Sequence, residues 1–117
     1  MFKRAARVLA LLTLLPFLLG AAPAAGTVRR VYNLTLTSAN TEYSLTLTGR
    51  VYQLTVQCRT AFDVKMGVAS GTSGSVYFTI KSGDAYYEQI VQINEETLYF
   101  QSTQAGVVVE VITWGED

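Results

Sequence analysis

Histidine is absent from this chain of 117 residues, and cysteine occurs once, at Cys58. The Ser-His-Asp and Cys-His nucleophile systems need an imidazole as base, and the common structural metal sites need His or at least two thiolates. These enzyme classes and metal centres are therefore excluded. A lone cysteine also excludes an internal disulfide, and we expect Cys58 to be an inert residue of the core.

Acidic residues are missing before Glu42, whereas Lys3, Arg4 and Arg7 lie near the start. Without residues 1–24 the chain has six basic and nine acidic groups, a net charge of −3. A surface that binds nucleic acid needs clustered Lys and Arg, so we expect no such partner. Most acids fall at expected turns and strand ends, without the spacing of a calcium loop or a glycosidase pair. We therefore predict no enzyme activity, no cofactor and no metal.

Residues 1–25 have the order of a secretory signal peptide. A basic segment at residues 1–7 precedes an apolar run at residues 8–20, and small residues follow. This order predicts a hydrophobic, signal-like helix that is removed from the mature protein. Two alternatives stay open: an uncleaved anchor, which would be the one membrane contact, and an extension upstream of the true start. The anchor is less favoured because a spanning helix needs roughly 20 apolar residues and this run is shorter and contains Pro16.

Residues 26–117 are predicted to form one domain, an all-β antiparallel sandwich of about eight strands with a jelly-roll-like arrangement. Apolar and polar residues alternate with a period of two, and turn residues recur every 8–12 positions, which is typical of sandwiches and barrels. The pattern indicates no helix in this region. The predicted strands cover residues 28–37, 42–48, 50–59, 63–69, 75–81, 85–93, 97–102 and 106–114.

The alternation assigns a face to each residue of a strand. It predicts that Tyr52 and Cys58 of the third strand, Val68 of the fourth and Val76 of the fifth face the core. The segment SGTSGS at residues 70–75 is predicted to be a surface loop, since it lacks the Lys and the following helix of a phosphate-binding loop.

The last predicted strand is apolar on both faces. Three valines of one phase fit the domain's own core, and the other phase carries Val108, Ile112 and Trp114. An apolar second face needs a second cover, and a small domain without disulfides or metal gains stability from association. We therefore predict a protein interface at these three residues and a homo-oligomer.

Tyr77 and Tyr99 fall on the polar phase of their strands, and either Tyr86 or Tyr87 must also face outward. Exposed tyrosines on a sheet are suited to a protein interface or to stacking on a sugar, and they also form cross-strand aromatic pairs. All three interpretations stay open, and Tyr77 and Tyr99 are candidate interface positions.

Four segments cover nearly the whole mature region: YNLTLTSANTEYSLTL at residues 32–47, LTVQCRTAFDVKMGV at 54–68, YFTIKSGDAYYEQIVQI at 77–93 and LYFQSTQAGVVVEVITW at 98–114. In this order they resemble small structural proteins of tailed bacteriophages, of the head-decoration or virion-associated kind. The resemblance implies a compact β-sandwich that binds the outside of an icosahedral shell, often as a multimer, and it implies no catalytic residues.

Two functional hypotheses follow. The first is a non-enzymatic structural protein that adds to a larger assembly, either a phage capsid or its own copies, and is located in the virion. The alternative is a secreted, periplasmic or cell-surface binding module that recognises a glycan or another surface ligand through exposed tyrosines.

Overall fold

The computed structural model describes residues 26–117, and of residues 90–93 it describes the backbone alone. The described chain is all-β and contains no helix. The predicted leader at residues 1–25 lies outside the described residues. The strands are β1 (Val28–Leu36), β2 (Tyr43–Thr46), β3 (Arg50–Cys58), β4 (Val64–Gly67), β5 (Phe78–Ile80), β6 (Ala85–Asn94), β7 (Thr97–Gln101) and β8 (Val107–Glu116).

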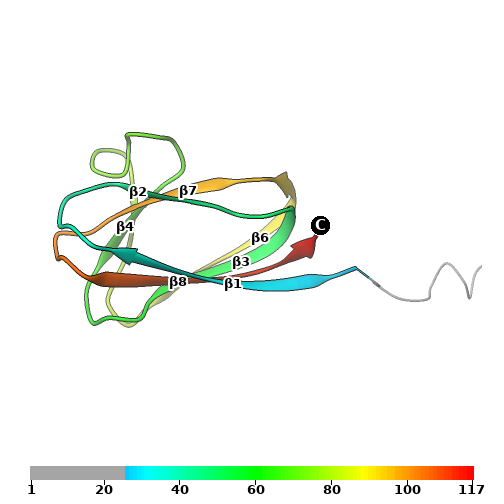
Figure 1. Ribbon diagram of the computed structural model, residues 1–117, viewed down its shortest axis with the longest axis horizontal. Helices are drawn as coiled ribbons and strands as arrows, with labels where there is room; N and C mark the ends of the chain where they lie inside the picture. The colour runs from blue at the N-terminus through cyan, green and yellow to red at the C-terminus, as the bar shows by residue number, and fades with distance from the viewer. Residues whose placement is uncertain (1–25) are drawn as a thin grey trace, which may run out of the picture.

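The eight strands form two four-stranded sheets, with the orders β1-β8-β3-β6 and β2-β7-β4-β5. All neighbouring strands run antiparallel. Figure 1 shows the sheets as two layers, with β2 and β7 in one layer and β1, β8 and β3 in the other. The predicted antiparallel sandwich of eight strands is confirmed at this level.

The core lies between the two layers and takes alternate residues from the strands. β8 shows this rule most clearly, because Val107, Val109 and Val111 are at most 1% exposed while the residues between them are half-buried. Burying one such side chain contributes roughly 1.5–3 kcal/mol. The core consists of Leu36, Leu47, Val51, Leu54, Val56, Val64, Met66, Ile80, Leu98, Phe100, Val107, Val109 and Val111.

Two tyrosine hydroxyls tie turns to the sandwich at the edge formed by β1 and β2. The hydroxyl of Tyr32 in β1 accepts a hydrogen bond of 2.9 Å from the backbone N–H of Thr48, in the turn between β2 and β3. The hydroxyl of Tyr43 in β2 accepts one of 2.9 Å from the N–H of Ser38. Both bonds satisfy turn N–H groups that no strand pairs, and they hold the two layers together at this edge.

The phase of β3 is shifted by one residue at its start, and the prediction that Tyr52 faces the core is wrong. Val51 pairs with Gly115 and Gln53 pairs with Trp114, which are adjacent in β8. Tyr52 is therefore an additional residue in a β-bulge. Val51, at 1% exposure, takes the core position instead. A bulge breaks the period of two, and the alternation alone does not reveal where it lies.

β4 and β5 are shorter than predicted, and the inward assignments of Val68 and Val76 are wrong. Val68 is 71% and Val76 72% exposed, because β4 ends at Gly67 and β5 begins only at Phe78. Both valines belong to the connecting loop, which emerges beyond the layer of β2 and β7 in Figure 1. Cys58 is half-buried and packs against the core, with its Sγ 3.0 Å from the hydroxyl of Thr60.

Candidate interaction surface

A row of mostly apolar side chains, interrupted by one threonine, crosses all four strands on the outer face of the β1-β8-β3-β6 sheet. Val31 of β1 pairs with Ile112 of β8. Ile112 pairs with Thr55 of β3, and Thr55 pairs with Tyr87 of β6. Directly opposed residues of antiparallel strands have Cβ atoms about 4.5–5.5 Å apart, so these four side chains are neighbours. We call this set the central row.

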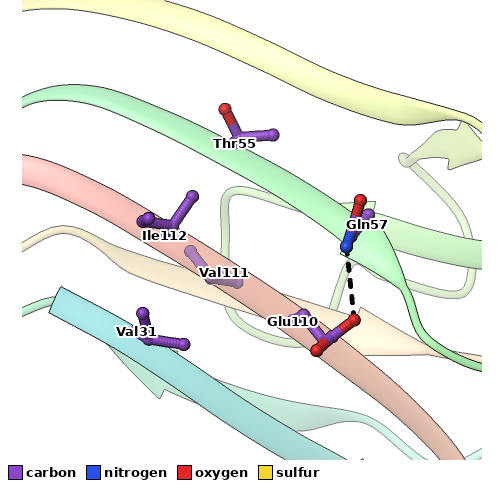
Figure 2. A pocket seen from close by; sticks show the side chains of 6 residues that line it. All are labelled: Val31, Thr55, Gln57, Glu110, Val111 and Ile112. Carbon is purple, nitrogen blue, oxygen red and sulfur yellow. Dashed lines mark hydrogen bonds between the residues drawn. The ribbon is translucent and has the colours of Figure 1, made fainter.

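The central row is open to solvent at both ends. Val31 is 67% and Tyr87 57% exposed, and the two residues between them are half-buried. A shallow hollow of about 230 Å³ lies along the row. Its lining consists of Val31, Thr55, Gln57, Glu110, Val111 and Ile112, as Figure 2 shows. The face therefore leaves apolar surface in water, which a partner would cover.

The three predicted interface residues of β8 all lie on this face. Val108, Ile112 and Trp114 occupy alternate, half-buried positions of the strand, outside the buried valines. Trp114 pairs with Arg29 of β1, and Val108 lies near the other end of the face. The fold thus brings these residues together with Tyr87, which is the outward member of the Tyr86 and Tyr87 pair, and with Val31, which the alternation did not single out.

A signal for Val31 was present in the sequence. In the first predicted strand, the residues of the inward phase are apolar apart from Arg30, and those of the other phase are polar apart from Val31. A lone apolar residue on a solvent face is common and needs no explanation. It becomes informative only once Ile112 is known to lie beside it.

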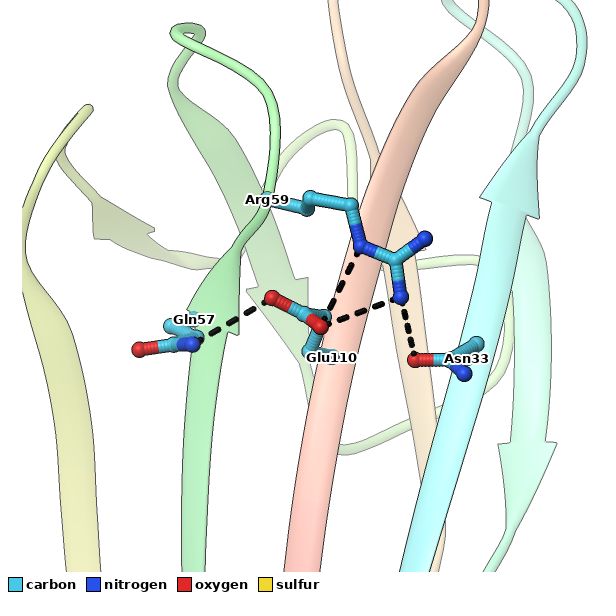
Figure 3. A network of polar contacts seen from close by, with 4 residues as sticks. All are labelled: Asn33, Gln57, Arg59 and Glu110. Carbon is cyan, nitrogen blue, oxygen red and sulfur yellow. Dashed lines mark hydrogen bonds and ion pairs between the residues drawn. The ribbon is translucent and has the colours of Figure 1, made fainter.

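A polar network borders the central row toward one end of the strands. The Arg59 side chain donates to the Glu110 carboxylate through Nε at 3.2 Å and Nη2 at 3.1 Å, and Nη2 also donates to Asn33 Oδ1 at 3.0 Å. The amide of Gln57 donates to the other Glu110 oxygen at 3.3 Å. Figure 3 shows that these side chains bridge β1, β8 and the end of β3. The network neutralises Glu110 within the face and provides a polar rim.

The structure places the two predicted tyrosines away from this face. Tyr99 belongs to β7 in the other sheet, where it pairs with Ser44 and Gly67. Tyr77 precedes β5, is 42% exposed, and has the ammonium of Lys65 4.7 Å from its ring centroid. Neither residue contributes to the surface around Ile112.

The loop of residues 68–77 folds back over the sheet beside Tyr99. A Cβ at Gly67 would be 3.2 Å from the Thr72 hydroxyl and 3.3 Å from Ser73, so the loop covers the glycine that pairs with Tyr99. Ser73 is fully buried, and its hydroxyl lies 3.1 Å from Gln101 of β7. The predicted surface loop is therefore packed in part against the sheet.

Glu42 holds this loop from outside. Its carboxylate accepts hydrogen bonds from the N–H of Gly71 at 2.8 Å, the N–H of Ser73 at 3.0 Å and the Ser73 hydroxyl at 2.6 Å. The Ser73 hydroxyl, followed by the two backbone N–H groups, lowers the pKa of Glu42 below its usual 4.5. The contact explains why a segment of Gly and Ser adopts one conformation here.

A second apolar surface lies where β5 and β6 form the open edge of the sandwich. Val68, Val76 and Phe78 are all more than half exposed. They line a hollow of about 260 Å³ together with Met66, Gly67, Tyr77 and Tyr86. The rings of Phe78 and Tyr86 lie 5.1 Å apart across this edge. The alternation of residues did not reveal this surface, because it placed Val68, Val76 and Phe78 on the core side, and the inward assignment of Phe78 is also wrong.

Tyr86 and Glu88 of β6 and Glu96, which precedes β7, form a cluster of three titratable groups. Burial raises the pKa of Tyr86 to about 12, and its hydroxyl donates to Glu88 at 2.9 Å, which adds to the shift. Burial, and secondarily the charge of Glu88, also raises the pKa of Glu96. Perturbed carboxyls also occur in acid–base sites. Tyr86 lines the hollow beside Phe78, whereas Glu88 and Glu96 line neither of the two hollows.

Across residues 26–117, no three side chains of His, Cys, Asp or Glu come close enough to hold a metal ion. Over the same range no helix has the length and hydropathy needed to cross a bilayer.

The fold of this chain is similar to that of a designed protein. A de novo designed double-stranded β-helix, solved by solution NMR, superposes with a TM-score of 0.48 at 11% sequence identity. The match covers 74% of this chain and 99% of the designed one. No protein-family model and no curated protein sequence matches the chain.

Proposed function

We propose that this chain is a non-enzymatic structural subunit that adds to a larger protein assembly through the outer face of the β1-β8-β3-β6 sheet. The observation that carries the proposal is the central row, in which Val31 and Tyr87 stay exposed on either side of Ile112. Specific interfaces have an apolar centre with aromatic residues and a polar rim. The central row, Trp114 and the Arg59 network supply these parts.

The proposed assembly is a tailed-phage particle, with the virion as the location of the protein. Its support is the resemblance of the four sequence segments to head-decoration and virion-associated proteins. The proposal takes the fold to be a jelly roll, because the strand orders β1-β8-β3-β6 and β2-β7-β4-β5 are those of two interleaved Greek keys. Viral capsid domains use this fold, as do lectins, so the fold by itself assigns no function.

The glycan-binding alternative has weaker support from the geometry. A stacking platform needs an aromatic ring with a free face beside other sugar-binding groups. The ring of Tyr77 has Lys65 over it, and the loop of residues 68–77 covers Gly67 beside Tyr99. The assembly hypothesis therefore takes precedence.

The location is tested by mass spectrometry of the native protein in gradient-purified particles and in the soluble secreted fraction. We expect the protein in the particles at a fixed ratio to the shell protein. Confinement to the secreted fraction, with a new N-terminus near Ala25, would contradict the virion proposal and favour the binding module.

The surface is tested with Ile112→Lys in the full chain, mixed with particles that lack the native protein. A lysine in the central row places a charge where the partner's surface would exclude water, so we expect the variant to stop co-sedimenting with the particles. Ser44→Lys is the matched control, since it adds the same charge at an exposed position of the other sheet. Equal co-sedimentation of Ile112→Lys and wild type, with wild-type circular dichroism in both variants, would sink the assignment of this face.

A further inference from the structure

We propose that the outer face of the β1-β8-β3-β6 sheet pairs with the same face of a second copy of this chain, about a two-fold axis parallel to the strands. This inference rests on the surface used in the proposed function and names its first partner. The second copy is then the member of the larger assembly that covers this face, and the first step of assembly is a face-to-face dimer.

The register of the strands determines which residues meet. A two-fold axis parallel to the strands reverses their order across the interface but preserves the height of each residue along the strand. β1 then lies over β6 of the second copy, and β8 over β3. In the central row, Val31 meets the second copy's Tyr87 and Ile112 meets its Thr55. Each exposed apolar end of the row thus covers the other, twice per dimer.

The charges on the face are compatible with this pairing. Arg29 lies in the row next to the central one, at the height of Gln89, and would face that amide of the second copy. Glu110 lies in the row on the other side, at the height of Gln57, and would face a second amide there. No like charges meet, although residues 26–117 as a whole have a net charge of −3. Identical faces of a charged protein otherwise repel each other.

The alternative two-fold axis, across the strands, matches the face less well. It would place Val31 against Val31 and Tyr87 against Tyr87, and it would bring Trp114 over Glu110 of the second copy. The indole has a single N–H donor, so most of the apolar ring would displace water from Glu110 and its polar partners Arg59 and Gln57 without replacing those hydrogen bonds, which is unfavourable. The parallel axis gives the same carboxylate an amide donor.

The area of the face predicts a reversible dimer. A face of four strands spaced about 4.8 Å apart, extending from Arg29 to Thr35, has a footprint of roughly 450 Å². Two such faces cover about 900 Å², close to the ~1,000 Å² that marks a specific interface. We therefore expect a dimer that dissociates on dilution into the micromolar range.

Sedimentation velocity over a range of concentrations tests the dimer. We expect wild type to shift from monomer to dimer with rising concentration, and Val31→Lys to raise the dissociation constant about tenfold or more. Ser44→Lys should dimerise like wild type, because it lies on the other sheet. A monomeric wild type at all concentrations, or a Val31→Lys protein that dimerises as well as wild type, would overturn the proposal.

Cross-linking tests the orientation. Facing sheets are about 10 Å apart, too far for a direct disulfide, so a short bismaleimide is the probe. Val31→Cys mixed with Tyr87→Cys should give a cross-linked dimer, whereas either variant alone should give no more than wild type, whose one thiol is Cys58. Efficient cross-linking of Val31→Cys to itself would show the other axis and contradict this arrangement.

The two proposals fail in different ways. If the protein is a monomer that still co-sediments with particles through Ile112, the second-copy inference is wrong and the proposed function stands. If it dimerises through this face but is absent from particles, the proposed function is wrong and the dimer stands.

Discussion

At the scale of single residues, Gly115 shows how closely two segments approach. It pairs with Val51 beside the β3 bulge, and a Cβ at this position would overlap the carbonyl oxygen of Arg50. That oxygen belongs to the backbone and has no alternative rotamer to move into. Only glycine therefore allows β8 to pass the start of β3 at this distance.

Gly115→Ala is predicted to lower the free energy of unfolding by about 3 kcal/mol, at the upper end of the usual cost of overpacking. Gly83→Ala is the control, because Gly83 has a positive φ of 84° but open space around its Cβ position. It should cost about 1 kcal/mol, from backbone strain alone. Urea unfolding of both variants measures the difference, and equal losses would contradict the role given to the Arg50 contact.

At the scale of elements, the connection between β4 and β5 depends on a charged group outside it. The loop of residues 68–77 has few apolar contacts of its own, and Glu42 satisfies two of its N–H groups. The ionised carboxylate accepts through both oxygens, as it does here from Gly71 and Ser73, whereas protonation turns one oxygen into an O–H donor. The tether of the loop is therefore pH-dependent.

This tether is predicted to weaken in acid. Because the folded-state pKa of Glu42 is lowered below 4.5, its contribution is complete above pH 4.5 and is lost as pH falls through the lowered value. In an NMR titration, the amide protons of Gly71 and Ser73 should shift with a midpoint below 4.5. Glu42→Gln should remove that transition at both amides. A midpoint at or above 4.5, or a transition that persists in the variant, would contradict the tether.

At the scale of the whole molecule, the strands of the β1-β8-β3-β6 sheet have different roles on their two faces. The inner faces of β1, β3 and β8 build the core, and their outer faces build the candidate surface. β8 lies between β1 and β3, so its outer residues Ile112 and Trp114 lie near the middle of the face rather than at an edge. A strand with two apolar faces thus contributes both to the core and to the middle of the outer face.

Self-association is predicted to depend only weakly on salt. The proposed contact joins apolar residues and neutral amides, and Glu110 is already paired with Arg59 within each copy. Screening therefore removes little attraction or repulsion. Sedimentation at about 0.05 and 0.5 M NaCl should give dissociation constants within about threefold of each other. A change of tenfold or more would indicate a contact between charged groups, and hence another surface.

Features that depend on local interactions were predictable from the sequence, and features that depend on long-range pairing were not. The eight strands, their approximate limits and the split of β8 into buried valines and outer Val108, Ile112 and Trp114 were predictable, because a period of two is a local property of an extended chain. The exposure of Val68 and Val76 was not, because strand pairing ends earlier than the pattern does. Nor was the bulge at Tyr52, which depends on the close approach of Gly115.

Which residues share a surface depends on how distant strands pair in the tertiary structure. Val31 and Tyr87 are far apart in the chain and join Ile112 through the register of three strand pairs. Glu42 reaches its loop through another long-range contact. Local patterning says which face of a strand a residue occupies, but the partners across a sheet depend on long-range pairing that no local pattern encodes.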